Sequence, residues 1–181
     1  MRALGPGSVS SFLKVILDVV HWVLIVSAGA VSLSMVAVLL LSFKPDLLAD
    51  VINLGDLPIK GPWIGPLAAG TLLAGDLYIA GALVIVGRLR RIFQTLIAGD
   101  PFHPDNVRRL RVIGAALAGL ELGRYGFAVI AQIVVHSLGL AKVDLGGQIN
   151  LNTWFSVLVI VVLAEVFREG ARLRGEAELT I

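Results

Sequence analysis

The sequence contains no cysteine and few charged side chains, and both deficits narrow what the protein can be. Without Cys the chain forms no disulfide and has neither a thiolate nucleophile nor a thiolate metal site. Charged residues make up 15% of the 181 residues, against about 25% in ordinary soluble domains. Hydrophobic residues make up 57%, and the mean hydropathy is +0.90. This composition predicts that lipid surrounds most of the chain.

Motifs for catalysis and metal binding are also lacking. The three His residues are scattered at 21, 103 and 136 and do not have the spacing of metal ligands. No paired His and Glu motif, no Gly-x-Ser-x-Gly motif and no nucleotide-binding glycine loop occurs. The net charge of +2 is too small to indicate nucleic acid binding. We therefore expect no enzyme activity, no metal, no cofactor and no direct binding of nucleic acid.

What the chain does contain is long apolar runs. A helix needs about 20 apolar residues to cross a bilayer, and four segments qualify, at about 12–43, 66–87, 112–136 and 153–168. The predicted fold class is all-α: one membrane domain, residues 1–181, with four transmembrane helices. The first run continues without a break past the sequence SAGA, which argues against a cleaved signal peptide.

Lys and Arg side chains predict the orientation, because they are enriched in the cytoplasmic loops of membrane proteins. One side of the predicted membrane has only Lys44, Lys60 and Lys142. The other side has eleven basic residues: Arg2, Lys14, Arg88, Arg90, Arg91, Arg108, Arg109, Arg111, Arg168, Arg172 and Arg174. Both termini and the loop 88–111 are therefore predicted to face the cytoplasm, with the protein in the plasma membrane.

The outer loops, 44–65 and 137–152, contain a weaker pattern. In the second loop, KVDLGGQINL alternates apolar and polar residues around Gly146 and Gly147, and a Gly-Gly pair provides the positive φ angles of a two-residue hairpin turn. The pattern leaves two alternatives, a small extracytoplasmic β-hairpin and an irregular loop.

A polar stretch between the second and third runs, AGDPFHPDNVRRLR, predicts two helices joined by a turn. Gly99 tolerates the left-handed conformation that follows a helix, and Pro101 blocks continuation of that helix. Pro104 fits the first turn of the next helix, with His103 as its N-cap and Asp105 near its positive end. The sequence thus predicts an αα-hairpin that protrudes into the cytoplasm.

Three features of this hairpin are not explained by the starts and ends of helices. Phe102 is the one apolar residue of the turn, and we expect it to pack between the two helices of the hairpin. Asn106 and the arginines at 88–91 and 108–111 have no local role in this interpretation. They are therefore candidates to contact anionic lipid headgroups or a cytoplasmic protein.

The run LRRIFQTLIAGDPFHPDNVRRLRVIG, residues 89–114, resembles the signature of a bacterial four-helix membrane family catalogued as domain of unknown function 2975. The shared pattern is G-x-P-F-x-x-x-N-x-x-x-L-R-x-I-G. Its positions here are Gly99, Pro101, Phe102, Asn106, Leu110, Arg111, Ile113 and Gly114. The family often has Thr or Ser where this chain has His103, and a hydroxyl is the better N-cap. The resemblance implies no activity. Some members are encoded beside small helix-turn-helix regulators, which implies a small transcription regulator as a candidate partner.

Polar residues also occur inside the predicted spans, where they are costly and often functional. Asp76 lies midway in the second span, and Glu121 and Arg124 lie midway in the third, three residues apart and so on one helical face. The sequence predicts an ion cluster of these three residues, with Tyr125 and Gln132 on the same face. It leaves open whether the cluster fixes helix register, relays protons or ions, or anchors a polar ligand.

The opposite face of the third span is made of small residues, which let a neighbouring helix approach closely. These residues are Ala115, Gly119, Gly123 and Gly126. We expect tight packing here, either against the small residues of the first span or in a homo-oligomer.

The sequence therefore favours a non-enzymatic integral membrane protein that acts by protein interaction or sensing through its cytoplasmic hairpin. The alternative is a small proton- or ion-coupled transporter or channel that uses Asp76, Glu121 and Arg124. An intramembrane enzyme is the least favoured class, because no catalytic motif is present.

Overall fold

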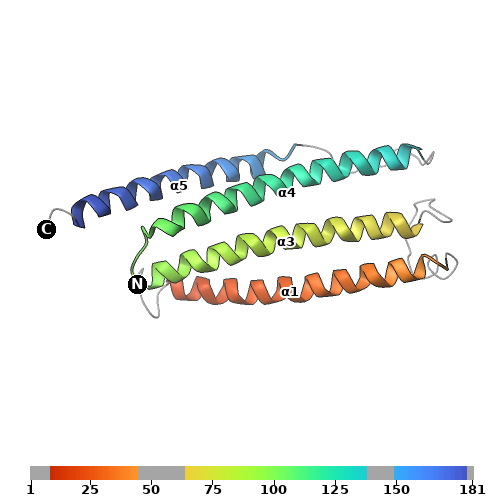
Figure 1. The fold of residues 1–181 in the computed structure, drawn as a ribbon, viewed down its shortest axis with the longest axis horizontal. Helices are drawn as coiled ribbons and strands as arrows, with labels where there is room; N and C mark the ends of the chain where they lie inside the picture. Colours follow the sequence, from red (N-terminus) through yellow and green to blue (C-terminus); the bar gives the residue numbers. More distant parts are fainter. Residues whose placement is uncertain (1–8, 45–63, 138–148, 179–181) are drawn as a thin grey trace. The chain divides into compact units, whose positions relative to one another are not determined.

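The computed structural model describes residues 9–44, 64–137 and 149–178, and these residues form four helices and no strand (Figure 1). The helices are α1 (Val9–Leu41), α3 (Ile64–Ile97), α4 (Pro104–Ser137) and α5 (Leu151–Glu178). All four are long and apolar enough to cross a membrane. The predicted all-α fold with four candidate spans is confirmed. The predicted β-hairpin around Gly146 and Gly147 lies outside the described residues.

All four helices are longer than a bilayer requires, and α3 and α4 are the longest. α3 and α4 have 34 residues each, or about 51 Å at a rise of 1.5 Å per residue, whereas the hydrocarbon core is about 30 Å thick. The charged residues of both helices gather toward the ends that the short turn after Ile97 joins. The arginine-bearing ends of α3 and α4 therefore have the length to extend beyond the hydrocarbon.

The chain divides into two compact units. The first unit contains Met1–Leu24, Gly81–Leu122 and Ile149–Ile181, and the second contains Ile25–Ala80 and Gly123–Gln148. α1, α3 and α4 contribute to both units, whereas α5 belongs to the first unit alone. In the first unit α3 lies between α1 and α4, and α5 lies along α4 (Figure 1).

The first unit has its apolar core where α3, α4 and α5 meet. The buried core residues are Ile92, Leu110, Ile113 and Ala164. α5 comes close to α4 because small residues lie at the contact: a Cβ at Gly114 would be 3.5 Å from Ile160 Cγ2. The core is small because most apolar side chains of the helices are on the outside, as expected for a protein whose surface meets lipid.

α1 is the most exposed helix. None of its most apolar window is buried, and Phe12, Trp22 and Leu33 are each at least 65% exposed. Its half-buried positions recur at alternating intervals of three and four residues, which is the spacing of a coiled-coil seam: Leu17, His21, Leu24, Ala28, Val31 and Met35. α1 therefore contacts the rest of the chain along one narrow stripe.

Two polar contacts fix α1 against α3, one in each unit. Arg90 donates to Asp18 in the first unit, and Ser32 donates to Asp76 in the second. Asp18 and Ser32 are 14 residues apart in α1, and Asp76 and Arg90 are 14 residues apart in α3. Each contact joins α1 to α3 within its own unit.

Candidate functional site

The turn between α3 and α4 is built from local hydrogen bonds. Gly99 has a positive φ of 82°, and the N–H groups of Gly99 and Asp100 donate to the carbonyls of Leu96 and Thr95 at 3.1 and 2.9 Å. These bonds satisfy carbonyls that the end of α3 leaves free. α4 begins at Pro104, and the Asp105 N–H donates to His103 Nδ1 at 3.2 Å. The imidazole thus accepts one of the free N–H groups at the start of α4.

Asn106 is the most buried polar residue of this region, with 0% exposure. Its Nδ2 donates to Thr95 Oγ1 at 2.7 Å and to the Pro101 carbonyl at 3.1 Å, and its Oδ1 accepts from Arg109 at 2.8 Å. One side chain thus ties the first turn of α4 to the last turn of α3 and to the loop between them. The expectation that Asn106 has no local role is wrong.

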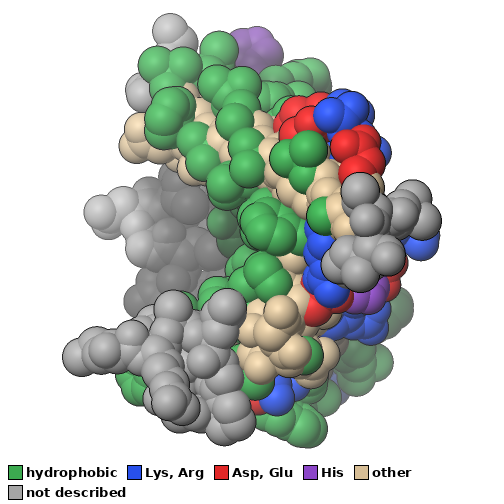
Figure 2. Space-filling model, turned by 90° about the vertical axis from the view of Figure 1, so that its left-hand side faces the viewer, with side chains coloured by type: hydrophobic (Ala, Val, Ile, Leu, Met, Phe, Trp, Pro, Cys, Tyr) green, Lys and Arg blue, Asp and Glu red, His purple; other side chains and the backbone are tan. Residues whose placement is uncertain are grey.

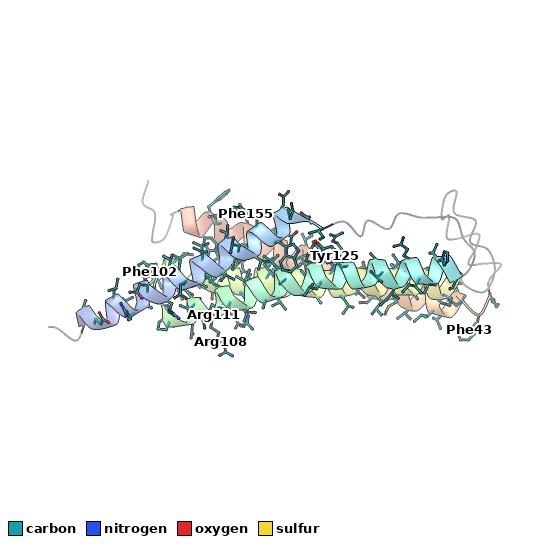
Figure 3. All side chains as sticks on the ribbon, turned by 90° about the horizontal axis from the view of Figure 1, so that it is seen from above. Phe43, Phe102, Arg108, Arg111, Tyr125 and Phe155 are labelled. Atoms are coloured by element: carbon teal, nitrogen blue, oxygen red, sulfur yellow. The ribbon has the colours of Figure 1, made fainter. Side chains whose placement is uncertain are left out.

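Phe102 packs against α5. Its ring lies 5.8 Å from the ring of Phe167 with an interplanar angle of 56°, and a Cβ at Gly170 would lie 2.5 Å from Phe102 Cδ1. Gly170 therefore leaves the space that the ring fills, and Figure 3 shows Phe102 beside α5. The contacts shown for Phe102 are with α5, where Gly170 leaves room for its ring. Its expected packing between α3 and α4 stays a prediction.

The residues of the G-x-P-F signature have related positions in the first unit. Leu110 and Ile113 are in the apolar core, Gly114 lies close to α5, and Pro101 accepts a hydrogen bond from Asn106. Together with Gly99 and Phe102, they shape the turn and hold the two helices on α5. Arg111 differs from the others, because its side chain is exposed.

Five of the ten Lys and Arg side chains that the structure describes in the first unit have an acidic partner. The ion pairs join Arg90 to Asp18, Arg109 to Asp105, Arg168 to Glu165, Arg172 to Glu169 and Arg174 to Asp100. Figure 2 looks onto the end of the molecule that carries the turn. It shows basic and acidic side chains gathered together on one side of this view. Pairing within the chain neutralises much of the charge at this end.

Four arginines differ from these, and we call them the arginine quartet: Arg88, Arg91, Arg108 and Arg111. None of the four makes an ion pair with any residue that the structure describes. Three of them are exposed and Arg88 is half-buried. Arg109 NH1 donates to the Arg91 carbonyl at 3.1 Å, so these parts of α3 and α4 lie at one level, and Arg108 extends away from the ribbons in Figure 3.

A second polar site lies in the second unit, on the contact between α1 and α3. Ser32 Oγ donates to Asp76 Oδ2 at 2.8 Å. Asp76 Oδ1 is inaccessible to solvent and has no hydrogen-bond partner among the described residues. Asp76 also makes no ion pair with any described residue.

The other residues of the predicted ion cluster are placed as follows. Glu121 is 6% exposed and belongs to the first unit. Arg124 belongs to the second unit, with its guanidinium 4.7 Å from the centre of the Tyr125 ring. Gln132 is exposed. A cluster that joins Asp76, Glu121 and Arg124 stays a prediction.

The small-residue face of α4 is open. Ala115, Gly119, Gly123 and Gly126 are exposed, and a Cβ at any of the three glycines would meet no described atom within 4 Å. The expected tight packing of the first span against this face is thus absent from the part of the chain that the structure describes. The homo-oligomer stays a prediction.

Two sets of partners could not be read from the residues beforehand. Gly170 and Phe167 are more than 60 residues from Phe102, and Ser32 and Asp18 are far from their partners on α3. A usable signal did exist for α1: Asp18 and Ser32, two of its polar residues, have the same spacing as Asp76 and Arg90. That equality predicts an antiparallel pairing in which both contacts form at once.

Comparison with known proteins gives one match. The model of a family described as protein of unknown function (DUF2975) matches residues 54–181, which is more than half of the chain. No curated protein and no solved structure matches. The matched range covers α3, the turn, α4 and α5, and therefore the whole apolar core of the first unit, whereas α1 precedes it.

Proposed function

Because the chain belongs to the family of proteins of unknown function DUF2975, whose description names no activity, we propose a function from the geometry of its own residues. The protein is a non-enzymatic, multi-pass protein of the bacterial plasma membrane. It binds the acidic surface of a cytoplasmic protein through the hairpin of α3 and α4. A small transcription regulator is one candidate for that partner.

The distribution of basic residues supports the orientation. In the predicted topology, the side of the turn has eleven Lys and Arg residues, against Lys44, Lys60 and Lys142 on the other side. Such an excess is typical of cytoplasmic segments. The turn, the arginine quartet and both termini are therefore assigned to the cytoplasm.

The packing of the first unit supports a preorganised surface. Asn106 holds the hairpin closed through two hydrogen bonds, to Thr95 and to the Pro101 carbonyl, and Phe102 fixes it on α5. These contacts hold the backbone of the hairpin, so less backbone entropy is lost when a partner binds than for a mobile loop. The hairpin is therefore suited to present its exposed arginines in one arrangement.

The observation that carries the proposal is that the arginine quartet makes no ion pair with any residue that the structure describes. A guanidinium has only donors, and it binds carboxylates in a two-pronged geometry. The acidic residues nearest in the chain, such as Asp105, are engaged by other arginines. Among the described residues the positive charge of the quartet is not neutralised, and we propose that a partner supplies the opposite charge.

Residue-specific crosslinking tests the proposal. Gln94 is exposed and lies three residues from Arg91 on the same face of α3, so a photo-crosslinking residue there samples the surface beside the quartet. We expect a discrete protein adduct that mass spectrometry identifies as cytoplasmic and acidic. R108Q/R111Q should lower the yield about tenfold, the effect of losing about 1.4 kcal/mol of binding.

The matched control is R168Q/R172Q, which removes two arginines that already have acidic partners on α5. It should leave the adduct in place. If Gln94 yields only lipid adducts, or if both double variants lower the protein adduct equally, the hairpin is not the docking surface and the quartet meets anionic headgroups alone.

A further inference from the structure

The contact between Ser32 and Asp76 is polar in a part of the chain that is otherwise apolar. On α3 the neighbouring side chains Leu73, Leu77 and Tyr78 are 49%, 64% and 59% exposed, and they lie within a candidate span. Asp76 therefore lies at a depth where the outer surface of α3 faces lipid hydrocarbon. An ionisable group at such a depth is costly and marks a functional site by default.

The hydrogen bonds of Asp76 do not match the needs of a carboxylate. An ionised carboxylate has about four acceptor sites on its two oxygens. Here Oδ2 accepts one bond, from Ser32 at 2.8 Å, and Oδ1 is shielded from solvent with no donor among the described residues. A negative charge would be left without water, donor or cation on that oxygen.

The charged and titratable groups around Asp76 do not supply a counter-ion. The second unit contains, on its described residues, Lys44, Tyr78, Arg124, Tyr125 and His136. Lys44 lies beyond the end of α1 and Tyr78 is turned outward. The Arg124 guanidinium stacks on Tyr125 at 4.7 Å, His136 is exposed near the end of α4, and no ion pair joins any of them to Asp76.

We propose that Asp76 is a proton-binding site: the proton is held on the carboxyl group at the contact of α1 with α3, and it keeps the two helices together in the second unit. The neutral acid has no charge to solvate, so the two helices stay in contact around it. Loss of the proton leaves a carboxylate that must recruit water or separate from α1. Among the described residues, the side-chain oxygens shown at the site are those of Asp76 and Ser32, too few for the shell of oxygens that metal cations need. This inference does not depend on the arginine quartet or on a protein partner.

Chemical labelling tests the proton directly. Dicyclohexylcarbodiimide is apolar and reacts with protonated carboxyl groups, so the protein in liposomes should be labelled at Asp76. The labelled fraction should fall by about tenfold for each pH unit above its midpoint, which is the slope of a single proton. Glu169, paired with Arg172 at the protein surface, is the internal comparison and should stay nearly unlabelled. D76N should lose the label at this position.

A second measurement tests the role of the proton in helix contact. The thermal midpoint of the natural protein should fall as pH rises through the labelling midpoint, whereas that of D76N, a neutral isostere of the protonated acid, should not change over the same range. S34A is the matched control for S32A, because Ser34 bonds to the Ala30 carbonyl of its own helix. S32A should move the labelling midpoint and S34A should not.

Each result decides for or against the site. Asp76 that is unlabelled at every pH, or labelled equally at every pH, overturns the proposal. Labelling that sodium chloride suppresses at constant pH, while choline chloride does not, also overturns it and identifies a monovalent cation site. If the thermal midpoint depends on pH to the same extent in D76N and in the natural protein, the proton on Asp76 does not hold α1 and α3 together.

Discussion

Replacing Asn106 by alanine should loosen the hairpin without preventing membrane insertion. The substitution removes three hydrogen bonds, two of them between neutral groups and one from the Arg109 guanidinium. Neutral bonds contribute about 1 kcal/mol each and charge-assisted bonds about 1.5–3 kcal/mol. A simple total would overstate the loss, because some partners keep other bonds.

The remaining contacts set the expected size. Thr95 still donates to the Ile92 carbonyl at 2.7 Å, and Arg109 still reaches Asp105 and the Arg91 carbonyl. The Pro101 carbonyl is the group that loses the one donor shown for it. We therefore expect N106A to lower the free energy of unfolding by about 2–3 kcal/mol, and the thermal midpoint by about 4–12 °C for a chain of this size.

Thermal unfolding in detergent, followed by circular dichroism, measures this effect. N152A is the control, because Asn152 is exposed at the start of α5 and its loss should cost less than about 0.5 kcal/mol. N106D should destabilise the protein as well, since it keeps an acceptor for Arg109 but loses both donors. The interpretation of Asn106 as a structural clamp is refuted if N106A and N152A have the same midpoint.

Two further outcomes follow from the same packing and from the predicted orientation. G170A should destabilise the protein by about 1–3 kcal/mol, because its Cβ would lie 2.5 Å from the Phe102 ring. G175A, whose Cβ would lie in open space, should stabilise the protein by up to about 1 kcal/mol. Shifts of the thermal midpoint in the same direction for both variants would contradict this. Since the chain has no Cys, a single Cys at Gln94 or at Ser137 is its sole thiol. An impermeant maleimide should label Gln94→Cys only in inverted vesicles and Ser137→Cys only in intact spheroplasts, and the reverse pattern would overturn the orientation.

The helix boundaries at the turn could be predicted because their causes are local. Gly99 adopts the positive φ that ends α3, and Pro104 begins α4, as the properties of these residue types require. The partner of Phe102 could not be predicted in the same way. It depends on which face of α5 meets the hairpin, and α5 has apolar residues on every side within the span.

The same difficulty affects the polar residues of the spans. In a soluble helix an apolar stripe indicates the buried face, but a helix in lipid is apolar all round and lacks that signal. The sequence thus identified Asp76 as a residue of interest but named Glu121 and Arg124 as its partners rather than Ser32. Ser32 is a weak signal alone, because a hydroxyl in a span often bonds to its own helix, as Ser34 does.

The use of α5 to complete the core has a consequence for biogenesis. Phe102, Leu110 and Ile113 are synthesised before Phe167 and Gly170, and translation of the intervening residues takes on the order of several seconds. Until α5 inserts, the hairpin has the ring of Phe102 and one side of its apolar surface uncovered. A nascent chain that stalls in this interval would expose this apolar surface to chaperones and membrane proteases. Insertion of α5 should therefore decide whether the newly made protein is protected from degradation.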